Sequence, residues 1–150
     1  MALPKLPLHG ACLCGSVQFI VTEPPLLTFA CHCRDCQKLS ASAFTLTTIV
    51  PSRGFACSGK LTRGGLGAPE RSHFYCASCL NIIYSRIAGA DDRINLRTSL
   101  LDEAASFAPS VELMTDEKLP WAEVPARHSY AKCPTSLAEL WALMQGDARN

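Results

Sequence analysis

The sequence predicts an all-β fold of folded antiparallel sheets stapled by zinc, followed by a short C-terminal helix. Three observations lead to this prediction. Short runs rich in β-branched and aromatic residues alternate with turns along most of the chain. Seven of the nine cysteines fall into three tight clusters, a pattern typical of metal ligands. A helical apolar stripe is found only near the C-terminus.

Length and composition predict one domain over residues 1–150, with 48% hydrophobic and 18% charged residues. No apolar run is long enough to cross a membrane, and the start, MALPKLPLHG, lacks the apolar core of a signal peptide. We therefore expect a cytoplasmic protein, in which thiols stay reduced and bind metal rather than form disulfides. The net charge of +1 predicts no nonspecific binding of nucleic acid or an anionic membrane.

The first predicted strand covers residues 10–22, where Val17, Phe19 and Val21 alternate with other side chains and form one apolar face. The following prolines end it, because proline donates no backbone hydrogen bond. A short strand over 27–30 leads into the segment CHCRDC, and a turn or single helical turn is predicted over 37–43. Further strands are predicted over residues 44–50, 55–57, 60–63, 72–75, 82–86, 94–98 and 111–114.

The predicted helix covers about residues 136–145. Thr135 or Ser136 can cap it, and one stripe collects the apolar side chains Leu137, Leu140, Trp141 and Met144. This stripe indicates a packing helix. The glycine-rich stretch 64–67 lacks the lysine, the serine and the following helix of a phosphate-binding loop, so we predict no nucleotide site there.

Two cysteine pairs from distant parts of the chain predict a structural zinc site. Cys12 and Cys14 alternate on a predicted strand, so both sulfurs can reach one ion. Cys76 and Cys79 have the spacing of a zinc knuckle, and the two pairs together supply four thiolates. The alternative for Cys76 and Cys79 is a redox dithiol. That motif begins a helix, whereas the flanking residues here look like antiparallel strands.

Cys31, Cys33 and Cys36 offer three thiolates that can meet at one ion and leave a fourth position open, as in catalytic zinc sites. His32 is expected to face away from that metal, either in solvent or supporting the ligands from outside. The alternative is a second structural site closed by a fourth ligand. The candidates for that ligand are Cys57, Cys133, His9 and His73, although Cys57 and Cys133 are more typically small buried hydrophobic side chains.

Three segments resemble, in order, the motifs GxCxCGxVxF, CHCxxCRK and a final CxxC of the glutathione-dependent formaldehyde-activating enzyme family. They are GACLCGSVQF, CHCRDCQK and SHFYCASC, and with Pro109, Val111 and Trp121 the likeness covers roughly residues 10–121. The resemblance implies a β-tent-like fold, also found in centromere protein V and in a chaperone-like exchange factor of Rab GTPases. It implies two zinc ions, a structural one on Cys12, Cys14, Cys76 and Cys79 and a catalytic one on Cys31, Cys33 and Cys36.

The same resemblance implies condensation of formaldehyde with glutathione to S-(hydroxymethyl)glutathione, counted as a carbon-sulfur lyase for the reverse reaction. We expect a small-molecule thiol such as glutathione to bind as the fourth zinc ligand and to attack an aldehyde. Lys38, Arg34 and Arg71 are candidate cations for an anionic thiol. The alternative function is a zinc-binding module without enzymatic activity that binds a protein partner.

The chain departs from the family motifs at three positions. Leu80 stands where the family has glycine after its last cysteine, and Ala41 replaces a glycine before Ser42. Gln37 replaces an arginine, which is expected to remove a cation facing the thiol substrate.

Overall fold

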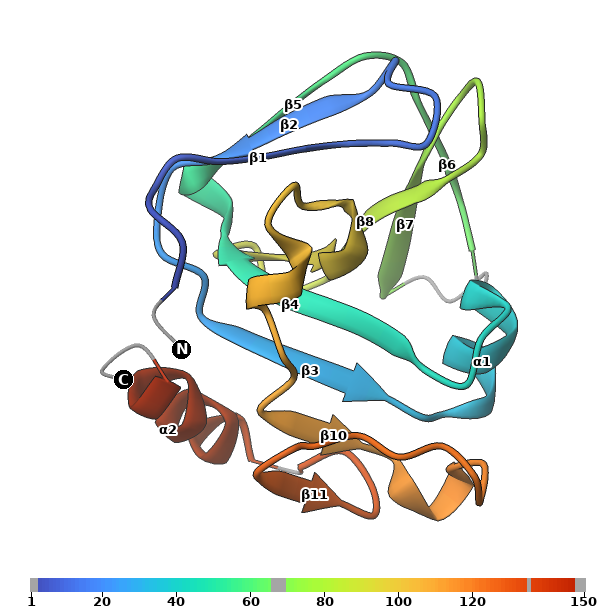
Figure 1. Cartoon of the computed structure of the whole chain (residues 1–150), viewed down its shortest axis with the longest axis vertical. Coiled ribbons are helices and arrows are strands. Elements are labelled where there is room, and N and C mark those ends of the chain that lie inside the picture. The colour runs from blue at the N-terminus through green and yellow to red at the C-terminus, as the bar shows by residue number, and fades with distance from the viewer. Residues whose placement is uncertain (1–2, 66–69, 135, 148–150) are drawn as a thin grey trace.

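The computed structural model describes residues 3–65, 70–134 and 136–147, whose strands form two sheets (Figure 1). The smaller sheet has the order β1-β2-β5, from β1 (Leu8–Ala11), β2 (Gln18–Val21) and β5 (Phe55–Ser58). The larger has the order β11-β10-β3-β4-β9-β8-β7-β6. Its strands are β3 (Leu27–Cys31), β4 (Thr45–Pro51), β6 (Leu61–Gly64), β7 (Arg71–Cys76), β8 (Ile82–Ile87), β9 (Arg93–Arg97), β10 (Val111–Leu113) and β11 (His128–Tyr130).

The predicted all-β class with folded sheets and a C-terminal helix is confirmed. Most neighbouring strands are antiparallel, but β10 pairs in parallel with both β3 and β11. Parallel neighbours need long crossover connections, which residues 32–110 and 114–127 supply. The sequence predicted only residues 10–11 of β1 and did not predict β11; both are short strands.

The predicted strand over residues 10–22 is wrong at residues 12–17, between the end of β1 and the start of β2. Residues 12–17 form a turn between β1 and β2, closed by the Cys12 amide donating to the Val17 carbonyl at 2.9 Å. Gly15, with φ +79°, supplies the left-handed residue of this turn. The predicted apolar face is confirmed, because Val17, Phe19 and Val21 are all buried.

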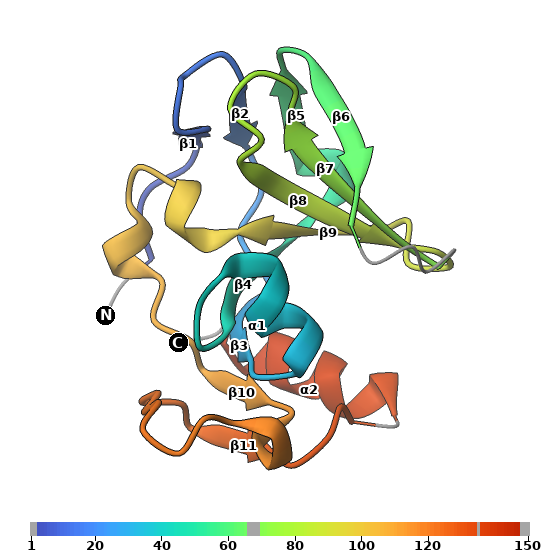
Figure 2. The same ribbon diagram turned by 90° about the vertical axis from the view of Figure 1, so that its right-hand side faces the viewer.

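Helix α1 (Arg34–Ser40) begins three residues before the predicted turn over 37–43 and includes Cys36. The Cys36 amide donates to the Sγ of Cys33 at 3.3 Å and so caps the helix start. The helix ends at Ala41, which has φ 49°. Between β9 above and β10 below, α1 covers the beginning of β4 (Figure 2).

Two hydrophobic cores lie on opposite faces of the large sheet. The first fills the space between the sheets and includes Leu8, Phe19 and Leu96. The second lies under helix α2 (Leu137–Asp147), whose Leu140 and Leu143 pack against it. The side chains of Leu137, Trp141 and Met144, together with Thr135 and residues 66–67 of the glycine-rich stretch, lie outside the described residues. No helix among the described residues has the length and apolar character of a membrane-spanning segment.

Candidate metal centres and the cavity beside them

The first cysteine cluster joins the two sheets. Cys12 and Cys14 lie in the turn between β1 and β2, Cys76 is the last residue of β7, and Cys79 lies in the turn that follows β7. All four Sγ atoms lie within 4.8 Å of one another, with Cys14 3.6 Å from Cys12 and 3.8 Å from Cys76. Four sulfurs at about 2.3 Å from a tetrahedral zinc lie about 3.8 Å apart, so the donor set fits this ion.

Hydrogen bonds at this cluster favour thiolates. The pKa of Cys76 is lowered to about 6, first by the amide of Cys79 and then by the hydroxyl of Ser16. Burial raises the pKa of Cys12, but hydrogen bonds from Val17 and Cys14 outweigh burial and leave the pKa lowered. The two turns are also linked directly, because the Leu13 amide donates to Oδ1 of Asn81 at 3.0 Å. Cys76 is therefore a thiolate at neutral pH, the form that binds a metal cation.

The second cluster, the cysteine trio Cys31, Cys33 and Cys36, lies where β3 meets α1. Cys31 is the last residue of β3, Cys33 caps the helix, and Cys36 lies in its first turn, so the three Sγ atoms fall within 4.8 Å of one another. Among the described residues, no further cysteine, histidine or carboxylate joins this group. Three sulfur donors can hold a metal ion and leave one position for another ligand.

The pKa values of Cys31 and Cys36 are shifted in opposite directions. A hydrogen bond from the Cys31 thiol, aided by Thr45 and by the positive charge of Arg97, lowers the pKa of Cys36 to about 5. The same hydrogen bond and burial raise the pKa of Cys31. Cys36 is therefore a thiolate at neutral pH before any metal binds.

A cavity of about 220 Å³ opens beside the trio. Its floor is one face of the large sheet, on which paired residues of neighbouring strands point the same way. One row of paired residues is Phe29, Thr47 and Arg97; the other is Ile49, Asn95, Ser85 and His73. Cys36 and Leu39 of α1 line one side. Cys133, Pro134, Ser136 and Leu140 from the C-terminal segment line another.

Three arginines line this cavity: Arg71, Arg93 and Arg97. Of the predicted cations, Arg71 is placed there, whereas Lys38 and Arg34 are exposed and line a hollow on the other side of α1. Sequence reasoning missed Arg97. The only signal in the sequence was its position at the end of a predicted strand. Nothing in the sequence indicates that this strand lies next to β4.

Gln37 does not face the cavity. It is buried, and its Nε2 donates to the carbonyls of His32 at 2.6 Å and Glu117 at 3.0 Å. Arg34 donates from Nη1 to Oε1 of the same side chain. The expectation that Gln37 removes a cation from the thiol site is therefore wrong; the side chain holds the backbone around the trio.

His32 is completely buried, so of the two expected positions the one in solvent is wrong and the one outside the ligands remains. It faces away from the trio, and its Nε2 lies 3.0 Å from Oε2 of Glu112 on β10. Glu112 also accepts hydrogen bonds from Lys118 at 2.8 Å and Ser129 at 2.6 Å. Burial raises the pKa of Glu112, but these partners outweigh burial and lower it overall.

The four candidates for a fourth ligand lie in two different places. Cys133 and His73 line the cavity beside the trio without joining the trio at ligand distance. Cys57 and His9 line a different hollow over the small sheet. Cys133 is exposed and Cys57 only partly buried, so the expectation that both are buried hydrophobic side chains is wrong.

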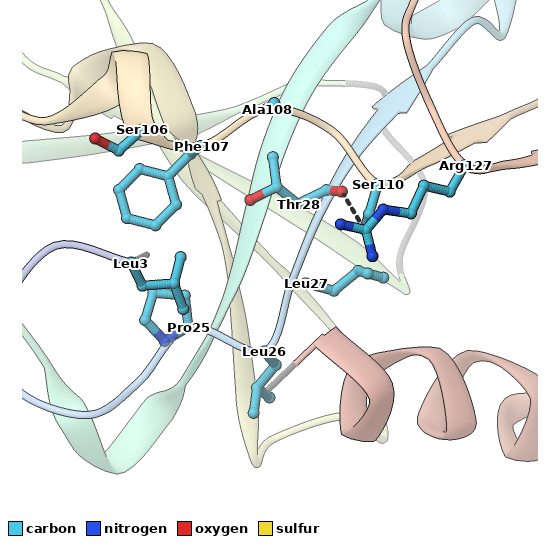
Figure 3. Close-up of a pocket in the computed structure, with 10 residues that line it drawn as sticks. All are labelled: Leu3, Pro25, Leu26, Leu27, Thr28, Ser106, Phe107, Ala108, Ser110 and Arg127. Atoms are coloured by element: carbon cyan, nitrogen blue, oxygen red, sulfur yellow. Dashed lines mark hydrogen bonds between the residues drawn. The ribbon is translucent and has the colours of Figure 1, made fainter. Parts of the chain in front are cut away.

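A third hollow of about 190 Å³ lies at the opposite end of β3 from Cys31 (Figure 3). Arg127 is the only titratable side chain among its lining residues, beside Phe107, Leu26 and Pro25. No described cysteine, histidine, aspartate or glutamate lines it. The chemistry of the described chain is therefore concentrated at the two cysteine clusters.

Comparisons with known proteins point to one enzyme family. The sequence model of the family described as glutathione-dependent formaldehyde-activating enzyme matches residues 7–117. A protein of Halomonas elongata, named as a candidate glutathione-dependent formaldehyde-activating enzyme, is 28% identical over 132 residues, covering 80% of this chain and 82% of the relative. A crystal structure of a Rhodobacter sphaeroides protein superposes with a TM-score of 0.52 at 17% identity, over 63% of this chain and 87% of that chain, and so supports the fold.

Proposed function

Because this chain belongs to the glutathione-dependent formaldehyde-activating enzyme family, we propose that it is a carbon-sulfur lyase. It would add a thiol such as glutathione to an aldehyde such as formaldehyde and catalyse the reverse cleavage. The observation that supports this proposal is the cysteine trio, which offers three donors to one ion beside a cavity large enough for a small substrate. In the forward reaction the sulfur–carbon bond forms, the thiol gives up its proton, and the carbonyl oxygen takes one up.

We assign zinc to both clusters, with Cys12, Cys14, Cys76 and Cys79 holding a structural ion and Cys31, Cys33 and Cys36 a catalytic one. Zinc on the trio would supply a fourth coordination position in which a substrate thiol is stabilised as its thiolate at neutral pH. The four-cysteine cluster is closed by its own donors and would contribute folding free energy instead.

The chain's own residues would prepare the site in three ways. Cys36, already a thiolate, needs no proton removed before metal binding. The apolar side chains Phe29, Ile49 and Leu113 line the cavity and limit water beside the sulfur. Arg97 places a positive charge near Cys36, which offsets the surplus negative charge of three thiolates on a divalent ion.

The direct test mixes metal-loaded protein with glutathione and formaldehyde and follows exchange of the hydroxymethyl adduct by NMR. We expect exchange faster than in buffer, and we expect Cys31→Ser to lose this acceleration while keeping its circular dichroism spectrum. Lys38→Gln is the matched control, because Lys38 is exposed and does not line the cavity. No acceleration by the wild-type protein would refute the lyase.

Elemental analysis of freshly purified protein tests the metal assignment separately. We expect two zinc ions per chain, of which one is removed by mild chelation and perturbed by added thiol. A single tightly held zinc would instead favour a module that binds a partner without catalysis.

A further inference from the structure

The cavity beside the trio has an unusual balance of charge. Its lining residues include three arginines but no aspartate or glutamate. His73, also in the lining, is nearly fully buried, and burial lowers its pKa to about 4, so it is neutral at physiological pH. The positive charges of the described lining are therefore opposed only by the cysteine sulfurs.

Arg97 is the buried centre of this positive charge. The residue is 9% exposed and donates from Nη1 to Oγ1 of Thr47 at 3.0 Å. Its Nε is buried and has no hydrogen-bond partner, and no carboxylate of the described residues forms an ion pair with it. Burying a guanidinium that has no carboxylate partner and an unpaired Nε is costly, which points to an acceptor that binds from outside the chain.

The positive charge of the arginines would exceed the negative charge of a metal-loaded trio. Three thiolates on a divalent cation carry a net charge of about −1. Arg93 lies 3.7 Å from the exposed carboxylate of Asp92, which leaves Arg71 and Arg97 facing that single negative charge. One positive charge therefore remains for an anionic ligand.

A second polar group without a partner belongs to another residue of the same lining. Nδ1 of His73 is buried without a partner, and His73 lies on the cavity floor in the row that begins at Ile49. In its neutral form the ring can donate one hydrogen bond. Arg97 on β9 and His73 on β7 thus both line the cavity, and each has a buried nitrogen without a partner.

The volume limits the size of that ligand. About 220 Å³ corresponds to roughly seven water molecules at about 30 Å³ each. It is also below the lower end, about 300 Å³, of typical pockets for drug-sized ligands. A carboxylic acid of a few carbon atoms fits inside with its chain against Phe29, Ile49 and Leu113, whereas a tripeptide must extend out of the cavity.

We propose that this cavity binds the carboxylate of a small substrate on Arg97 and Arg71, with the substrate's reacting end directed to the cysteine trio. The reaction at the trio rests on the proposed function, whereas the carboxylate site rests on the cavity itself. Two substrates share this chemistry, a mercapto acid that supplies the thiol and an oxo acid that supplies the aldehyde.

The carboxylate site is tested with propionate as the probe, using isothermal titration calorimetry on the full metal-loaded chain. We expect propionate to bind and its neutral analogue propionamide to bind at least about tenfold more weakly, since a charge-assisted hydrogen bond is lost. Arg71→Gln should weaken propionate binding by a similar factor, and Lys38→Gln should leave it unchanged. Equal binding of the acid and the amide would overturn the proposal.

Arg97→Gln should abolish propionate binding. Because Arg97 is buried, circular dichroism must first show that this variant folds; Arg71, which is exposed, supplies the test if it does not. Arg97→Lys keeps the charge but loses Nε and the planar guanidinium group. We therefore expect this variant to bind propionate more strongly than Arg97→Gln and more weakly than the wild type.

Two catalytic arms then distinguish the sources. Faster exchange with 3-mercaptopropionate and formaldehyde than with glutathione and formaldehyde assigns the carboxylate to the thiol. Faster exchange with glutathione and glyoxylate than with glutathione and formaldehyde assigns it to the aldehyde. Propionate binding without any catalysed exchange would refute the lyase and support the carboxylate site. Formaldehyde exchange without propionate binding would support the lyase and refute the carboxylate site.

Discussion

Nε2 of His32 lies 3.0 Å from Oε2 of Glu112, and this buried pair ties the segment between Cys31 and Cys33 to strand β10. The His32 amide reinforces the tie by donating to the carbonyl of Leu113 at 2.9 Å. Two metal-binding candidates thus flank a residue that is held on both its backbone and its side chain. The position of the trio depends on β10, a strand about eighty residues later in the chain.

Replacing Glu112 tests this relationship. In Glu112→Ala, His32 and Lys118 lose their shared acceptor, so we expect the free energy of unfolding to fall by about 1 to 3 kcal/mol. We also expect the trio to bind its metal about tenfold more weakly, as for other side chains that orient metal ligands. Urea unfolding and competition with a chelator measure the two effects. Glu70→Ala, at an exposed position, is the control, and equal behaviour of both variants would contradict the prediction.

The two cysteine clusters should respond differently to loss of one sulfur. We expect Cys76→Ser to unfold or aggregate, because the four-cysteine cluster joins the two sheets and its metal contributes folding free energy. Cys31→Ser should retain the fold and lose only the second metal. Thermal unfolding followed by metal analysis separates these outcomes. Cys57→Ser removes a partly buried thiol outside both clusters and should change neither property.

His73 makes stability depend on pH in a defined window. Burial, together with the charges of Arg97 and Arg71, lowers the pKa of His73 from 6.5 to about 4. The unfolded chain therefore binds this proton first as the pH falls, so the contribution of neutral His73 is complete above pH 6.5 and is lost towards pH 4. Because the site faces a cavity, we expect a contribution on the order of 1 to 2 kcal/mol, less than the whole pKa shift implies.

Urea unfolding of the wild type and His73→Gln, each at about pH 7 and about pH 4.5, checks this window. The wild type should lose more stability than the variant between the two conditions. Acid also releases metal from both proteins, so the comparison depends on the difference between them. Parallel losses would show that His73 does not contribute.

Two departures from the family motifs place a residue with a side chain at a positive φ angle. Leu80 and Ala41 replace glycines and have φ values of 59° and 49°, a left-handed conformation that glycine adopts without strain. Relief of that strain exceeds the extra entropy of glycine in the unfolded chain, so Leu80→Gly should stabilise the protein by up to about 1 kcal/mol. Thermal unfolding measures the change. Leu13→Gly, at another exposed leucine without positive φ, should give no gain.

The sequence by itself determined the strand-rich fold and the grouping of the cysteines. Period-two patterns such as Val17, Phe19 and Val21 report burial of one strand face directly, and short cysteine spacings bring sulfurs together through local geometry alone. The meeting of Cys12 and Cys14 with Cys76 and Cys79 was also predicted, because four is the number of donors that closes a tetrahedral site. The sequence misjudged the local backbone, since Cys12 and Cys14 lie in a turn and Cys36 in a helix.

Only the tertiary structure decided what surrounds the trio. Arg97, His73 and Cys133 reach one cavity because β9, β7 and the C-terminal segment converge on the same face of the large sheet. Likewise, the parallel pairing of β10 with β3 brings Glu112 to His32. Such neighbours are separated by dozens of residues, and no spacing rule encodes them, because strand order and register depend on the packing of the whole sheet.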